Sequence, residues 1–122
     1  MPTENKRTGA HGLVTHQFVA LEVALQVIER LRPVVMIVRR QDADLARQIV
    51  RAASSIAANV AEGNRRIGKD RLHSFRIAAG SADETVAHLR VALAWGYVQG
   101  PQVESALQVI DRELGLLWGL TH

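Results

Sequence analysis

The sequence contains no cysteine, which excludes disulfide bonds and thiolate metal sites and is typical of a protein of the reducing cytoplasm. No apolar run approaches the about 18 residues that a membrane-spanning helix needs, and no apolar signal core follows the first residues. Aromatic residues make up only 4% of the chain, so few side chains are available to stack on bases. We therefore expect a cytoplasmic protein that has no membrane association.

The 122 residues suffice for one domain, which at this size buries roughly two-thirds of its unfolded surface. Residues 1–13 mix Pro, Thr, Asn, Lys, Arg and Gly without an apolar period, which predicts a disordered leader. The domain then occupies residues 14–122. No alternation typical of strands, internal repeat or low-complexity block occurs in it.

The first predicted helix begins near Thr15, a possible N-cap, because apolar residues then recur at alternating steps of three and four. Pro33 would remove a helical hydrogen bond, which predicts a kink or a short break near Arg30. The apolar face predicted for this helix comprises Val14, Phe18, Leu21, Leu25, Ile28, Leu31 and Val35.

In the second predicted helix an aspartate between Gln41 and Asp44 serves as the cap, and Gly63 ends the helix in a left-handed C′ conformation. The third begins near Lys69, and Gly80 in its middle predicts close approach by another helix. Their apolar faces are Leu45, Ile49, Ala52, Ile56 and Val60, then Leu72, Phe75, Ala79, Ala82, Val86, Leu89 and Leu93.

Gly96, Gly100 and Pro101 separate the third helix from a fourth. Four helices with short connections predict an all-α, up-down-up-down antiparallel four-helix bundle. The apolar face of the fourth helix comprises Val103, Leu107, Ile110, Leu114 and Leu117.

No arrangement of side chains indicates catalysis, so we predict no enzymatic activity, no catalytic residue, no metal and no cofactor. Glu84 and His88 lie four residues apart, but a bundle metal site needs Glu-x-x-His on two helices and further glutamates. Arg66 and His73 are similar to the pairs of helical ribonucleases, yet a glycine turn separates them, which favours a solvated or interface histidine.

Ser55, Asn59 and Glu62 recur at helical spacing on one face of the second helix. A glutamate so near a helix C-terminus opposes the helix dipole, which indicates that a partner holds it. We favour a structural role at the turn into the third helix, with direct ligand contact as the alternative.

Nine Lys or Arg residues lie between Arg39 and Arg76, against four acids. Arginine, which suits bidentate contact with phosphate, supplies thirteen of the fifteen cations. This excess of cations favours an anionic partner. The alternative is that these arginines pair with acids or are solvated on helix faces, which would give the same composition. The predicted nucleic-acid-binding residues are Arg47, Arg51, Arg65, Arg66, Lys69, Arg71 and Arg76.

A set of residues in the second and third predicted helices and the segment after them forms a recognisable pattern: Gln48, Arg51, Ala52, Ser55, Ile56, Asn59, Ala61, Glu62, Gly63, Phe75, Ile77, Ala78, Gly80, Ser81, Glu84, Gly96 and Tyr97. With these residues the chain resembles the family of four-helix bundles encoded in intervening sequences of bacterial 23S ribosomal RNA genes. The accessory variability protein of diversity-generating retroelements is similar to the same family. The resemblance covers about Val14 to Leu120.

The resemblance implies a non-enzymatic homo-pentamer with a basic surface that, in the retroelement branch, binds nucleic acid and a reverse transcriptase. We expect self-association through apolar residues near one end, namely Trp95, Tyr97, Val98 and Trp118. The predicted function is binding of RNA or DNA backbone with low sequence specificity. The alternative is a protein-interaction scaffold, for a reverse transcriptase or another acidic partner.

Overall fold

The computed structural model describes residues 9–122, with side chains from His16 onward. In that range the chain forms four helices and no strand: α1 (Gly9–Gln41), α2 (Ala43–Arg65), α3 (Gly68–Trp95) and α4 (Gly100–Thr121). The all-α prediction is confirmed. Most of the predicted leader lies outside the described residues, and because α1 already begins at Gly9, Thr15 is inside the helix and is not its cap.

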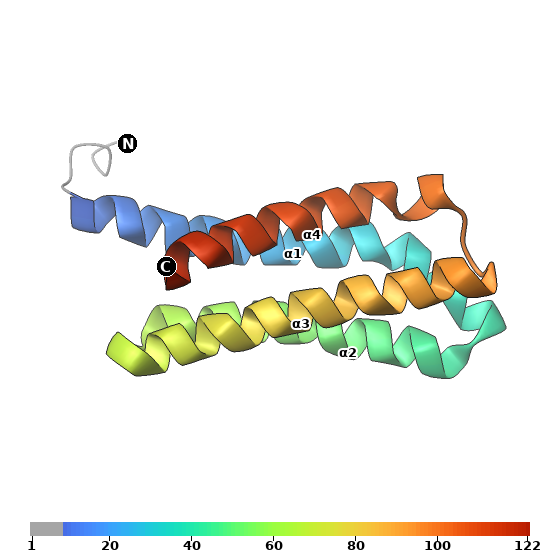
Figure 1. Cartoon of the computed structure of the whole chain (residues 1–122), viewed down its shortest axis with the longest axis horizontal. Coiled ribbons are helices and arrows are strands. Elements are labelled where there is room, and N and C mark those ends of the chain that lie inside the picture. The colour runs from blue at the N-terminus through green and yellow to red at the C-terminus, as the bar shows by residue number, and fades with distance from the viewer. Residues whose placement is uncertain (1–8) are drawn as a thin grey trace.

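The helices form an antiparallel bundle in which each packs against two neighbours: α1 with α2, α2 with α3, α3 with α4, and α4 with α1. Figure 1 shows α3 and α4 in front of α2 and α1, so the α1–α2 face and the α3–α4 face lie on opposite sides of the molecule. One end carries the α2–α3 turn and is called the α2–α3 end. The other carries the α1–α2 and α3–α4 turns and is called the two-turn end.

The face of α1 that packs against the core overlaps only partly with the predicted one, since Leu31 and Val35 are buried as predicted. Phe18 and Leu25 are 63% and 42% exposed, whereas Ala20 and Ala24 are fully buried. The alanines face the core because their small side chains let the helices approach closely. The predicted short break is also wrong, since α1 runs through Pro33 without interruption.

The ends of α2 show one confirmed prediction and one error. The Asp42 side chain accepts a hydrogen bond of 2.9 Å from the backbone N–H of Leu45, as expected of an N-cap. Gly63, however, does not stop the helix, which continues to Arg65. Left-handed backbone occurs instead at Gly68 and Gly96, with φ of 61° and 78°.

The two glycines predicted from helix patterns have other roles than expected. Gly63 is buried, and a Cβ atom placed on it would lie 2.5 Å from Cε1 of Phe75, so this glycine makes room for the ring. Gly80 is exposed, with nothing within 4 Å of an added Cβ. Close helix approach therefore occurs at Gly63 and not, within the bundle, at Gly80.

The aromatic residues predicted to gather near one end are separated. Trp95 and Trp118 are 70% and 64% exposed, but Trp95 ends α3 at the two-turn end and Trp118 lies near the end of α4, at the opposite end. Tyr97 is half-buried and stacks on Trp95 with ring centroids 6.3 Å apart, while Val98 is buried. The prediction of a single aromatic patch is wrong.

Candidate functional site

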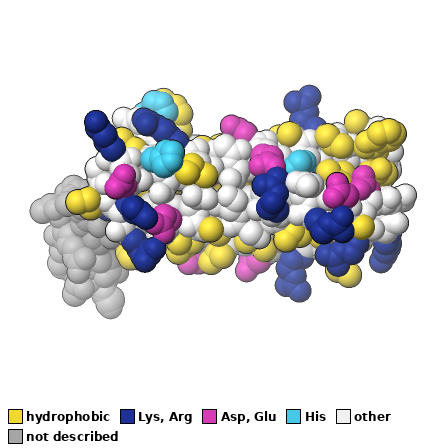
Figure 2. Space-filling model, turned by 90° about the horizontal axis from the view of Figure 1, so that it is seen from below, with side chains coloured by type: hydrophobic (Ala, Val, Ile, Leu, Met, Phe, Trp, Pro, Cys, Tyr) yellow, Lys and Arg dark blue, Asp and Glu magenta, His cyan; other side chains and the backbone are white. Residues whose placement is uncertain are grey.

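The seven predicted nucleic-acid-binding cations fall into two groups. Arg47 and Arg51 lie in the half of α2 toward the two-turn end, while the others surround or follow the α2–α3 turn. At a rise of 1.5 Å per residue, Arg47 and Arg65 are about 27 Å apart along α2. Figure 2 shows Lys and Arg side chains gathered toward both ends of the face in view. The cations therefore do not form one continuous patch.

Several of these cations contact groups of their own chain. Arg47 pairs with Asp44 at 3.2 Å, Arg51 pairs with Glu84, and Arg71 Nε donates to the carbonyl of Gly63 at 3.3 Å. The ion-paired arginines are at least half exposed, and exposed pairs are worth at most about 1 kcal/mol. Such weak pairs leave the guanidinium groups available to phosphate.

Glu62 holds two arginines at the end of α2. Its carboxylate accepts from Arg65 NH2 at 2.7 Å and from Arg66 Nε at 2.6 Å. Hydrogen bonds from Arg65 and then Arg66 lower the pKa of Glu62 below its ordinary 4.5. Lys69 and Arg76, by contrast, have no ion pair within the described part of the chain. They are the two predicted cations most open to an external anion.

A small polar cluster joins α2 to α3. Ser81 Oγ donates to Ser55 Oγ at 2.8 Å, and Asn59 Nδ2 donates to the same oxygen at 3.1 Å and to the Ser55 carbonyl at 2.9 Å. The short hydroxyl side chains allow the two helices to approach here. These hydrogen bonds lie within the chain, so a structural role for Ser55 and Asn59 stays our prediction.

Replacing Asn59 tests this interpretation. We expect Asn59→Ala to lower the free energy of unfolding by about 1 kcal/mol, because the amide bonds to Ser55 are lost. Ser54→Ala, at an exposed serine of the same helix, should change it by less than about 0.5 kcal/mol. Urea denaturation gives both values. Unchanged stability of Asn59→Ala together with lost nucleic-acid binding would instead make Asn59 a ligand contact.

Glu84 occupies a second contact between α2 and α3. It pairs with Arg51 and lies 3.2 Å from Nε2 of His88, and these two partners, Arg51 first, lower the pKa of its carboxyl. No group of three or more His, Asp or Glu residues that could hold a metal ion occurs among residues 16–122. Near the α2–α3 turn, Arg66 forms an ion pair with Glu62, and His73 is exposed.

Comparison with known proteins identifies the family. The family model described as 23S rRNA-intervening sequence protein matches residues 19–119. The chain belongs to this family. It is also similar to a crystal structure of a protein with unknown function from the S23 ribosomal protein family of Bacteroides thetaiotaomicron VPI-5482, with TM-score 0.79 and 22% identity over 87% of this chain and 97% of that one. No curated protein matches.

This member of the 23S rRNA-intervening sequence protein family also carries a buried carboxyl that sequence analysis missed. Glu113 on α4 is 0% exposed, and neither of its carboxylate oxygens has a hydrogen-bond partner within the described residues. Burial raises its pKa from the ordinary 4.5 to about 8. The available sequence signal was its position. Glu113 lies three residues after Ile110 and four before Leu117, both buried, and so on the inner side of α4.

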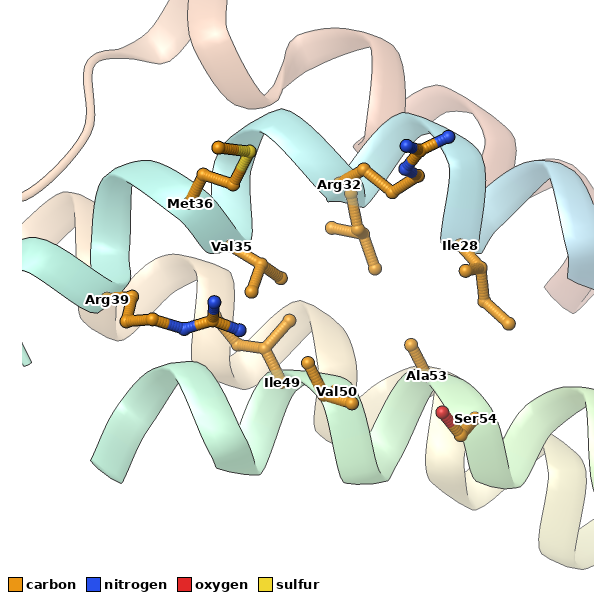
Figure 3. Close-up of a pocket in the computed structure, with 10 residues that line it drawn as sticks. Ile28, Arg32, Val35, Met36, Arg39, Ile49, Val50, Ala53 and Ser54 are labelled. Carbon is orange, nitrogen blue, oxygen red and sulfur yellow. The ribbon is translucent and has the colours of Figure 1, made fainter. Parts of the chain in front are cut away.

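A groove between α1 and α2, also unpredicted, is the second feature of this family member. Figure 3 shows Ile28, Val35 and Ile49 on its walls, with Arg32 and Arg39 from α1 beside them. No acidic residue lines it. The complete lining of the groove is Ile28, Leu31, Arg32, Val35, Met36, Arg39, Ile49, Val50, Ala53 and Ser54.

The described helices include none long and apolar enough to span a membrane.

Proposed function

We propose that this protein is a non-enzymatic, self-associating bundle that binds the phosphate backbone of RNA or DNA in the cytoplasm with low sequence specificity. The observation that carries nucleic-acid binding is the excess of cations around the α2–α3 turn, where residues 62–76 contain five cations and two acids. The cations are Arg65, Arg66, Lys69, Arg71 and Arg76, and the acids are Glu62 and Asp70.

Phosphate is the part of a nucleic acid that this end suits. Helix α3 begins there at Gly68 without a side-chain cap, so the N–H groups of its first turn can face an anion, with Asp70 as the one acid in that turn. Between residues 62 and 76 the only aromatic ring of Phe, Tyr or Trp belongs to Phe75, which is buried and cannot stack on a base. Binding should therefore depend on charge and not on base identity.

Removing three charges at the α2–α3 end tests the site. Binding to a generic RNA should weaken as salt rises, with a slope of log affinity against log salt near −0.7 per phosphate contacted on a single strand. Replacing Arg65, Arg66 and Lys69 by glutamine should reduce the steepness by about 2 and lower affinity at least about tenfold in low salt. Fluorescence anisotropy over a salt series measures both.

The control removes the same charge elsewhere. Replacing Arg30, Arg40 and Arg90 by glutamine lowers the net charge equally, in the halves of α1 and α3 toward the two-turn end, and should change the slope much less. Equal effects of the two triple variants would mean that net charge and not the α2–α3 end governs binding. A parent protein that binds no RNA or DNA even near 50 mM salt, where phosphate contacts are strong, would contradict the proposal.

Self-association is supported by large apolar side chains left uncovered on the bundle. Phe18, Met36, Trp95 and Trp118 are each more than half exposed, and burying such large apolar side chains between copies would stabilise a contact. A closed ring repeats the cations once per subunit, which multiplies their attraction for a polyanion. The pentamer is the assembly that the family resemblance implies.

A protein-interaction scaffold is the second candidate function. It is favoured by Ile77, Val91 and Trp95, which are exposed on α3. Helical spacing places all three on one side of that helix. A partner protein such as a reverse transcriptase would bury them. Binding that is insensitive to salt and is lost on Trp95→Ala would favour this candidate over nucleic-acid binding.

A further inference from the structure

The groove between α1 and α2 combines an apolar floor with a basic edge. Arg32 and Arg39 are exposed and have no ion pair among residues 16–122. In Figure 3 the Arg39 side chain extends over the groove toward Ile49, while the Arg32 side chain points away from it. An occupant of this face should therefore be apolar at its centre and acidic beside Arg32 and Arg39.

The opposite face of the same molecule has the complementary composition. A groove between α3 and α4 is lined by Leu93, Val103 and Leu107 together with Glu104 and Asp111, and no cation lines it. Both acids are exposed and lack an ion pair in the described part of the chain. One face thus supplies the charges that the other face needs.

The two sets of charges also have the same spacing. Arg32 and Arg39 are seven residues apart on α1, as are Glu104 and Asp111 on α4, which is two helical turns or about 10.5 Å in each case. Continuing each series by seven residues leads to Leu25 and to Trp118, which are 42% and 64% exposed. Each helix therefore carries two charges and one uncovered apolar side chain in one stripe.

An antiparallel arrangement brings the two stripes into register. It sets Arg39 opposite Glu104, Arg32 opposite Asp111, and Leu25 opposite Trp118. Helices α1 and α4 run antiparallel within the bundle. When two copies lie side by side and point the same way, α1 of one copy is therefore antiparallel to α4 of the other. Heptad-spaced pairing of this kind is how helices specify partners in coiled coils.

We propose that copies of this protein associate head to tail, with the α1–α2 face of one copy against the α3–α4 face of the next. The inference rests on the self-association proposed above and specifies its surfaces. Because the two surfaces differ, the contact is heterologous and repeats from copy to copy, giving a ring when the rotation closes and a filament when it does not. A two-fold dimer would instead set one basic face against another.

Charge reversal in the 122-residue chain tests the pairing. A basic-face variant carries Arg32→Glu and Arg39→Glu, and an acidic-face variant carries Glu104→Arg and Asp111→Arg. Each variant has like charges on both faces, so we expect its self-association to weaken about a hundredfold. Mixing the two variants restores complementary contacts wherever the variants alternate and should regenerate assemblies of mixed composition, although a closed ring with an odd number of copies keeps one like-charged contact. The quadruple variant, with the faces exchanged, should assemble alone.

Sedimentation velocity and light scattering give the masses, and circular dichroism checks that each variant folds, since all four side chains are exposed. A parent protein that is monomeric at micromolar concentration would overturn the self-association itself. A parent that assembles while either double variant assembles equally well would overturn only the face pairing. A parent that stays monomeric while the basic-face variant loses RNA binding would assign the groove to nucleic acid.

Discussion

The free energy of unfolding should fall by about 5 kcal/mol between about pH 4 and about pH 9 because of Glu113 alone. The carboxyl is 0% exposed on α4, and neither oxygen has a hydrogen-bond partner within the described residues. Its charged form therefore has no solvation inside the bundle. Arg112 favours the charged form, but burial outweighs it and raises the pKa to about 8.

The sign follows from comparing the two states. The unfolded chain releases the Glu113 proton near the ordinary pKa of 4.5, whereas the folded protein holds it until about 8. Between these values the folded state binds more protons, so stability decreases as pH rises. The destabilisation is absent below 4.5 and complete above 8. At 1.36 kcal/mol per pKa unit, the full effect is about 5 kcal/mol.

Urea denaturation at a fixed protein concentration across this pH range measures the effect. Glu113→Gln carries no ionisable group and should lose little stability over the same range, so its difference from the parent isolates the carboxyl. Glu62 and Glu84 do not interfere, because their lowered pKa values place their effects below pH 4.5, where stability falls as pH falls. A pH dependence shared by parent and Glu113→Gln would contradict the prediction.

Glu113 also shows what hydrophobic periodicity leaves undetermined. The spacing of apolar residues predicted α4, but with Leu107 and Leu114 on its inner face, whereas Ala106 and Glu113 are the buried residues. Both choices fit a step of three or four, because 3.6 residues make a turn. The four helices are therefore predictable from sequence, and so is the inner face of α2, whose five predicted residues are all buried. The rotation of α1 and α4 depends in addition on how closely their neighbours approach.

The candidate site was predictable only where it is local in sequence. Ser55 and Asn59 lie four residues apart on one helix, so their contact follows from helical geometry. Ser81, their partner on α3, depends on how α2 and α3 slide past each other, which spacing does not determine. The cations from Arg47 to Arg76 are close in sequence, but α2 is 23 residues long and separates them into two groups.

The glycines give the second large expected effect. We expect Gly63→Ala to lower the free energy of unfolding by about 2 to 3 kcal/mol, although alanine is intrinsically the better helix former by about 1 kcal/mol. The added Cβ would lie 2.5 and 2.7 Å from Cε1 and Cδ1 of Phe75. The ring is 0% exposed and packed on every side, so relieving the overlap requires the helices to separate.

Gly80→Ala is the matched control, because it makes the same substitution inside the neighbouring helix where nothing lies within 4 Å of the new methyl group. It should stabilise the protein by about 0.5 to 1 kcal/mol through helix propensity alone. The difference between the two variants then measures overpacking at Phe75.

A second experiment makes Gly63→Ala in a Phe75→Leu background. The glycine substitution should cost less there than in the parent, since the smaller side chain leaves space for the methyl group. Equal effects of Gly63→Ala and Gly80→Ala in urea denaturation would show that α2 and α3 can separate at this contact without cost, and that the bundle does not depend on a glycine at position 63.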